Sequence, residues 1–288
     1  MRIQHNIAAL NTHRNLAANN AAASKNLEKL SSGYKINRAG DDAAGLAISE
    51  KMRGQISGLD MASKNANDSI SLIQTAEGAL NETHSILQRM RELAVQSSND
   101  TNTADDRLKL QAETDQLAKE INRISDTTEF NTKKLLNGNL SGAAVAGTRD
   151  GTLTFHIGAN EGQTMTLDIA NLNASTLSVG TGAGEAGKGI KISTQTGAEA
   201  AITSIDKAIN TVSSTRSNLG AVQNRLEHTI NNLGAASENL TAAESRIRDT
   251  DMAKEMMTFT KNNILTQAAQ SMLAQANQQP QGVLQLLQ

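Results

Sequence analysis

The glycine-rich stretch GAGEAGKG at residues 182–189 is the part of the sequence nearest to a chemical motif. It contains G-x-G-x-x-G, a spacing that lets backbone amides approach a phosphate at the start of a helix. Here the motif is followed by IKIST (190–194), which alternates like a strand, and position 189 is Gly where a Mg²⁺-binding Ser or Thr would be needed. The stretch therefore favours a flexible surface loop over a nucleotide site.

The other residue types that could do chemistry are scattered or missing. No two histidines stand four residues apart, so the helical spacing of a metal-ligating pair is missing. There is no G-x-S-x-G elbow around a serine and no cysteine for a thiol, disulfide or thiolate metal site. We expect no cofactor, no metal and no enzymatic activity. The histidines are His5, His13, His84, His156 and His228.

Residues 87–96, LQRMRELAVQ, carry a mixed charged and apolar arc. The arc turns away from the heptad positions Leu87 and Ala94, and it places an Arg four residues before a Leu. A small exposed patch of this kind can be an interface, although a solvated helix face is the alternative. We expect Leu93 to be exposed. The arc consists of Arg89, Glu92, Leu93 and Gln96.

Long helices must position these residues. From residue 45 to about 128, two rows of mostly apolar residues repeat every seven positions, which is typical of a helix–helix seam. SSNDTNTADD (97–106) breaks the pattern with turn and capping residues. The first row is Met52, Leu59, Ala66, Ile73, Leu80, Leu87 and Ala94, and the second is Ala62, Ser69, Ala76, Thr83 and Met90.

The second half of the sequence repeats this organisation. Thr196 and Glu199 have the spacing of a capping box and predict the start of a helix that extends to about residue 247. Between the helical halves, TLTFHI and TMTLDI alternate around the turn NEGQ (160–163), which predicts a β-hairpin. The seven-residue row of this helix is Ile205, Val212, Leu219, Leu226, Leu233, Leu240 and Ile247.

The two ends of the chain form a third pattern. Residues 1–27 contain no Asp or Glu, and residues 262–288 contain no charge. Apolar, Asn and Gln residues recur there at helical spacing, which predicts surfaces that bind another copy of the chain. The net charge of −2 implies no nucleic-acid partner, and no apolar run reaches the roughly 20 residues of a membrane helix. No secretory signal peptide is recognisable. The surface residues are Ile3, Ile7, Leu10, Leu265, Met272, Leu284, Leu286 and Leu287.

Long segments at both ends resemble bacterial flagellin. They cover about the first 135 and the last 90 residues, whereas residues 140–195 are only loosely similar. The segments include IQHNIAALNT (3–12), EKLSSGYKINRAGDDAAGLAISEKMR (28–53), ISLIQTAEGALNETHSILQRMRELAVQ (70–96), RISDTTEFNTKKLL (123–136), LGAVQNRLEHTINNL (219–233), NLTAAESRIRDTDMAKEM (239–256) and NNILTQAAQSMLAQANQQPQGVLQLL (262–287).

The resemblance implies a mainly α fold, a long coiled-coil helical bundle with a small β-hairpin. Residues 1–44 and 247–288 would pair as an inner-tube coiled coil, with a linker at about 33–44. Residues 45–139 and 196–246 would form an outer-tube helical domain. Residues 140–195 would be a short variable region that holds the hairpin and the glycine-rich loop.

The resemblance also implies the function. Copies of the chain would assemble into the helical filament of the bacterial flagellum, because heterologous contacts that do not close a ring give an open helix. The chain would leave the cell through the flagellar type III export channel and lie outside it in the filament. Its partners would be other copies, an export chaperone on the C-terminal segment, and the filament cap and hook-junction proteins. A secreted flagellin-like adhesin and a hook-junction protein are the alternatives.

A host receptor is a further implied partner. Gln88, Arg89, Leu93 and Gln96 match the segment that the flagellin-sensing Toll-like receptor reads. Glu113 matches the partner position on the following short helix. The terminal leucines resemble the part read by cytosolic sensors, although the chain ends in Gln288 where many relatives end in Arg.

Overall fold

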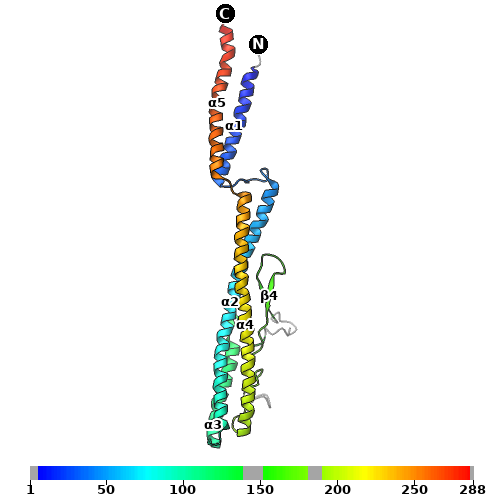
Figure 1. Cartoon of the computed structure of the whole chain (residues 1–288), viewed down its shortest axis with the longest axis vertical. Helices are drawn as coiled ribbons and strands as arrows, with labels where there is room; N and C mark the ends of the chain where they lie inside the picture. The colour runs from blue at the N-terminus through cyan, green and yellow to red at the C-terminus, as the bar shows by residue number, and fades with distance from the viewer. Residues whose placement is uncertain (1–5, 139–151, 181–189, 286–288) are drawn as a thin grey trace. The chain divides into compact units, whose positions relative to one another are not determined.

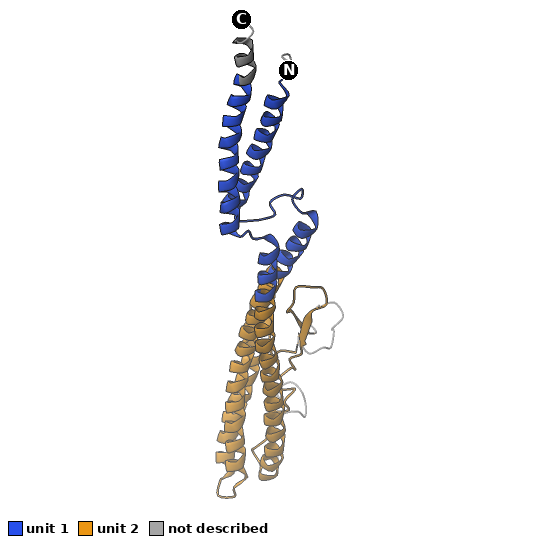
Figure 2. Cartoon of the chain, turned by 45° about the horizontal axis from the view of Figure 1, so that its top comes forward, with its two compact units in different colours: residues 1–56, 238–288 blue, residues 57–237 orange. Residues whose placement is uncertain are grey.

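The computed structural model describes residues 6–138, 152–180 and 190–285, and the side chains up to residue 278. The chain is mainly helical, as the sequence predicts, and its described residues include two short hairpins, of which one was predicted (Figure 1). It divides into two compact units: unit 1 is residues 1–56 and 238–288, and unit 2 is residues 57–237 (Figure 2). The elements are α1 (Ile7–Ser32), α2 (Ala43–Ser98), α3 (Ala104–Thr127), β1 (Glu129–Phe130), β2 (Lys133–Lys134), β3 (Leu153–His156), β4 (Thr164–Leu167), α4 (Gln195–Arg248) and α5 (Met252–Gln285).

In unit 1, α1 and α5 pack side by side and antiparallel (Figure 1). Asn6, at the start of α1, donates its side-chain N–H to the carbonyl of Ala276, 2.8 Å away, near the end of α5. The less exposed residues of each helix recur at alternating spacings of three and four, as in a coiled coil. On α1 they include Ala9, Thr12, Leu16, Asn19, Ala23, Asn26 and Leu30, and on α5 Glu255, Phe259, Asn262, Thr266, Ala269, Leu273 and Ala276.

The two connections within unit 1 lie against each other. Gly33 ends α1 with φ of 75°, a left-handed conformation that glycine adopts without steric cost. Backbone hydrogen bonds then join the connections, from Lys35 N to Arg248 O (2.7 Å) and from Thr250 N to Gly33 O (3.0 Å). The Arg248 guanidinium lies over the Tyr34 ring, 4.7 Å from its centre. The connections are therefore held by specific contacts.

Two aspartates organise the start of α2. The Asp42 carboxylate accepts a hydrogen bond from Gly45 N (2.9 Å) and so caps the helix. The Asp41 carboxylate pairs with Lys25 of α1 at 2.8 Å and accepts from the backbone N–H of Asn37. The hydrogen bond from Lys25 holds the pKa of Asp41 below its ordinary value.

In unit 2, α2 and α4 run antiparallel along the predicted heptad rows. Their contacts pair ascending positions of α2 with descending positions of α4. They are Asp60 with Ser237 (3.2 Å), Glu77 with Arg216 (3.6 Å) and Arg91 with Asp206 (2.7 Å). Within unit 2 the predicted seam residues from Ala62 to Ala94 on α2 and from Ile205 to Leu233 on α4 are buried. The prediction of two long helices that share one seam is confirmed.

The short helix α3 folds back on α2. Thr103 caps it, because its hydroxyl accepts from Asp106 N and the Asp106 carboxylate accepts from Thr103 N. The break at residues 99–103 confirms the turn that the sequence predicts. Ile121 and Ile124 of α3 are buried with the α2 seam in one hydrophobic core.

The predicted hairpin is β3–β4, and it adds its apolar face to the same core. Leu153 pairs with Leu167, and Phe155 pairs with Met165. The hairpin loop approaches α2 so closely that a Cβ at Gly58 would lie 2.9 Å from the Cβ of Ala159. Glycine is therefore required at this crossing. Asn65 of α2 adds a hydrogen bond to the carbonyl of His156 (3.1 Å).

Three local expectations change. The helix α4 begins at Gln195, and its cap is Thr194, whose hydroxyl accepts from Gly197 N at 3.2 Å. The capping box at Thr196 and Glu199 is therefore wrong by two residues. Residues 190–194 alternate in burial but form no strand, because side chains of α2 and α3 take up their backbone groups. The two-residue hairpin β1–β2 was not predicted. The loop at 181–189 lies outside the described residues.

Candidate functional site

The terminal helices carry large apolar side chains that do not point into their shared seam. Leu10 is 70% exposed and Met272 is 60% exposed. The seam between α1 and α5 takes mostly small and polar residues together with four large apolar ones, and other large apolar side chains remain uncovered outside it. The large apolar residues of the seam are Leu16, Leu30, Phe259 and Leu273. We name the uncovered set the terminal apolar surface: Ile7, Leu10, Ile264, Leu265 and Met272. Of the other predicted assembly residues, Ile3, Leu286 and Leu287 lie outside the described residues, as does the side chain of Leu284.

A second candidate site lies on unit 2, where α2 faces α3. The Arg89 guanidinium binds the Glu113 carboxylate of α3, with Nη2 and Nε lying 2.9 and 3.1 Å from Oε1. Its Nη1 reaches Glu92 Oε2 at 3.1 Å. Glu113, followed by Glu92, raises the pKa of Arg89 above its ordinary value. We name Gln88, Arg89, Glu92, Gln96 and Glu113 the Arg89 patch; all five are exposed.

The prediction that Leu93 is exposed is wrong. Leu93 is 1% exposed and belongs to the core of unit 2. It lies four residues after Arg89 and four before Ser97, so the three share one face of α2. Both neighbours are bonded to α3, because the carbonyl of Ser97 accepts from Arg107 Nε at 3.0 Å. The face that points away from the α4 seam is therefore covered by the short helix.

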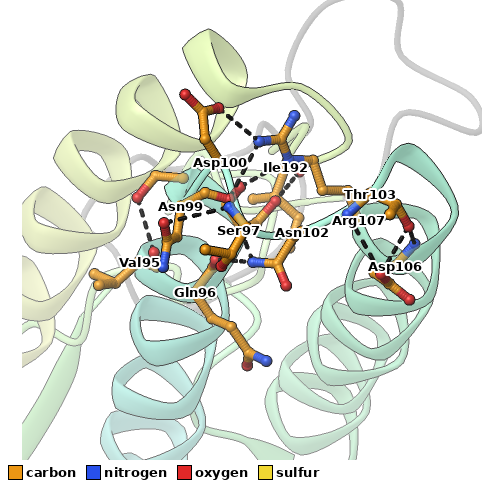
Figure 3. A network of polar contacts seen from close by, with 12 residues as sticks. Val95, Gln96, Ser97, Asn99, Asp100, Asn102, Thr103, Asp106, Arg107 and Ile192 are labelled. Atoms are coloured by element: carbon orange, nitrogen blue, oxygen red, sulfur yellow. Dashed lines mark hydrogen bonds and ion pairs between the residues drawn. The ribbon is translucent and has the colours of Figure 1, made fainter.

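Polar side chains that the sequence did not single out hold the end of α2 in place. Figure 3 shows Arg107 reaching from α3 toward the carbonyls of Ser97 and Asn99, with Asp100 beside it. The Ser97 hydroxyl donates to the carbonyl of Ile192. Asn102 donates to the carbonyl of Gln96. These contacts satisfy the last carbonyls of α2, which lack partners within the helix, and so fix the backbone beneath Gln96.

No described histidine is part of either surface, and His5 lies outside the described residues. His13, His156 and His228 are exposed on separate elements, and His84 contacts Gln88 through its ring Nε2 at 3.1 Å. No group of His, Asp or Glu in the described ranges could hold a metal ion. Within those same ranges, no helix is both long and apolar enough to cross a membrane.

Comparison with known proteins identifies both ends of the chain. Residues 3–141 match the model of the bacterial flagellin N-terminal helical region, and residues 202–287 match that of the C-terminal helical region. The chain belongs to the bacterial flagellin family. Flagellins of Halalkalibacterium halodurans and Bacillus subtilis are each 58% identical to it, over 287 and 304 aligned residues, and the matches cover all of this chain and all of each relative.

Flagellin is the structural subunit of the flagellar filament, and the chain is such a subunit. A solved structure described as a flagellar hook-associated protein of Vibrio parahaemolyticus shares the fold. That protein is 16% identical, with a TM-score of 0.56, over 73% of this chain and all of its own. The fold therefore does not separate a filament subunit from a hook-junction protein. The full-length identity to flagellins favours the filament subunit.

Proposed function

We propose that this flagellin assembles into the filament through the terminal apolar surface. The observation that carries the proposal is the exposure of Ile7, Leu10, Leu265 and Met272 on helices whose own seam is already filled. Burying one such side chain contributes roughly 1.5–3 kcal/mol, and the described residues of a single chain leave these side chains 41–70% exposed. Neighbouring copies are the occupants that a helical homopolymer supplies.

The assembly surface can be tested with paired substitutions. The double variant Leu265→Glu/Met272→Glu should raise the concentration needed for filament growth more than tenfold, because a buried unpaired charge costs several kcal/mol. The monomer should keep its helicity, since both positions are exposed. The matched control is Leu265→Met/Met272→Leu, which keeps the surface apolar and should polymerise normally. Filament yield is measured by sedimentation and electron microscopy. Normal growth of the Glu variant would refute the proposed surface.

The remaining roles extend the same proposal. Residues 1–44 and 247–288 would line the inner tube, and 45–139 with 196–246 would form the surrounding helical layer. The chain would be secreted and lie in the extracellular filament. An export chaperone would cover the C-terminal segment before assembly, and the cap and hook-junction proteins would contact the ends of the filament. The role is mechanical, without catalysis.

We also propose that the monomer binds the host flagellin-sensing Toll-like receptor through the Arg89 patch. The support is geometric: Gln88, Arg89 and Gln96 of α2 and Glu113 of α3 are exposed on helices that pack against each other. Arg89 is held by two carboxylates, so the patch is organised before a partner arrives. Leu93 supports this patch from below and is not part of its surface.

Arg89→Ala and Glu113→Ala should each raise the monomer concentration for half-maximal receptor signalling about tenfold or more, because Arg is enriched among the dominant residues of interfaces. Arg91→Ala is the matched control, because Arg91 is an exposed Arg on the same helix that pairs with Asp206 on α4 instead. Exposed ion pairs contribute little to stability, so all three variants should unfold as the wild type does. An unchanged dose–response for Arg89→Ala, or an equal loss for Arg91→Ala, would contradict the proposal.

A further inference from the structure

The most buried side chain described in α1 is a polar amide. Asn26 is 8% exposed, in a helix whose other described residues are more open. In the amide orientation that satisfies its neighbours, its Oδ1 accepts from Asn262 Nδ2 of α5 at 3.0 Å. Its Nδ2 donates to Glu255 Oε1 at 3.1 Å and to Ala22 O at 3.2 Å. Three polar side chains therefore meet inside the seam between α1 and α5.

The apolar part of this seam specifies register only in part. On α1, Ala9, Leu16, Ala23 and Leu30 follow one another at seven-residue intervals, so a slide by seven residues exchanges alanine and leucine positions there. On α5, Ala269 and Ala276 are one heptad apart, so the same slide replaces one alanine with another. The same slide in one direction would set Asn26 between Asn262 and Ala269, so its amide would lose the Glu255 carboxylate as a partner on α5, and losing a partner of a buried polar group costs free energy.

The other polar residues of the seam do not impose a register. Thr12 donates to the carbonyls of its own helix at Ala8 and Ala9, and Thr266 donates to Asn262 O. Asn6 does reach α5, but its acceptor is the backbone carbonyl of Ala276, a group that every residue offers. Only the Asn26 cluster pairs side chain with side chain across the helices among the contacts described.

We propose that Asn26, Asn262 and Glu255 fix the register of α1 against α5. A buried Asn in a coiled coil specifies alignment at some cost in stability. Alignment matters here because the terminal apolar surface is contributed by both helices, so a slide would separate its two halves along the axis. The inference rests on the proposed assembly role of that surface, and it makes Asn26 and Asn262 positioning residues for assembly.

Spin-label distances test the register directly. The chain has no cysteine, so Arg14→Cys and Lys261→Cys, both at exposed positions, label α1 and α5 specifically. Labelled chains are polymerised with a large excess of unlabelled chain, so that the measured distance is within one subunit. The native cluster should give a single narrow distance. With Asn26→Leu/Asn262→Leu, we expect a second population, because one heptad displaces the labels by about 10 Å along the axis.

Asn19→Leu is the matched control, because Asn19 occupies the same seam row one heptad before Asn26 and has no described bond to α5. It should keep the single distance. An unchanged distance in the double Leu variant, or equal broadening in Asn19→Leu, would overturn the proposal.

If the double Leu variant fails to enter filaments, the distance and the far-UV circular dichroism are measured on the soluble chain. Wild-type helicity with an altered distance supports the register role. Lost helicity, or an unaltered distance, overturns it. Failure of the assembly proposal is distinguishable, because that proposal fails if Leu265→Glu/Met272→Glu polymerises normally, whatever the register.

Discussion

Deleting residues 262–288 should abolish filament formation and leave unit 2 folded. The deletion removes the α5 half of the seam from Asn262 to Ala276, so most of α1 loses its partner. It also removes Ile264, Leu265 and Met272 from the terminal apolar surface. Most helical stability in proteins comes from packing of one helix face against a partner, so α1 without most of α5 should be largely unstructured.

Unit 2 should be indifferent to the deletion because it buries its own core. Residues such as Ile73, Leu80 and Ile205 are fully buried, and unit 2 ends at residue 237. Filaments are assayed by electron microscopy and sedimentation, and unit 2 by its cooperative thermal transition in circular dichroism. Filaments at normal yield would contradict the role of α5 in assembly. Loss of the thermal transition would contradict the independence of unit 2.

Leu93→Ala should destabilise unit 2 by about 2–5 kcal/mol, because a buried leucine truncated to alanine leaves a cavity between α2 and its neighbours. The measurement is urea unfolding of the monomer with the denaturant slope held common between variants. Leu108→Ala is the matched control: Leu108 lies on α3 and is 57% exposed, so its truncation should change stability by less than about 0.5 kcal/mol.

The same variant separates a core role from a receptor contact. Where Leu93→Ala is still fully folded, its receptor signalling should match the wild type, because the side chain has almost no exposed area. A loss of signalling as large as that of Arg89→Ala, in a chain of wild-type stability, would mean that Leu93 is a surface contact after all.

The arrangement of elements was predictable because its signals are local and repeated. Seven-residue rows predicted α2 and α4, turn residues at 97–106 predicted the break before α3, and strict alternation predicted β3–β4. The start of α4 was misplaced because two threonines, Thr194 and Thr196, stand within reach of a cap. Which one caps depends on the path of the preceding backbone, and that path is set by contacts such as Gln111 with Ile192.

The candidate sites were predictable only in part. The sequence identified Arg89 and Glu113 through the family resemblance, and the structure brings them together as an ion pair. The sequence analysis placed Leu93 at the surface because a heptad row identifies only one packing partner of a helix. The helix α2 packs against two, α3 and α4. Arg107, which fixes the turn beneath Gln96, left no local signal because two of its three acceptors are backbone carbonyls.

The sequence by itself determined that the chain is a helical, cysteine-free flagellin with charge-poor ends. Composition and heptad periodicity suffice for the helices and for the charge-poor ends, because each is a property of one helix at a time, whereas the family follows from the resemblance of long segments at both ends. Only the tertiary structure decided which faces of α1 and α5 meet. The exposed leucines Leu10 and Leu265 were obvious candidates for their seam, yet the seam uses other leucines together with alanines, threonines and the Asn26–Asn262 pair. Small residues let two helices approach closely, and buried amides need hydrogen-bond partners. Whether either requirement is met depends on residues of α1 and α5 that lie more than 200 positions apart in the sequence.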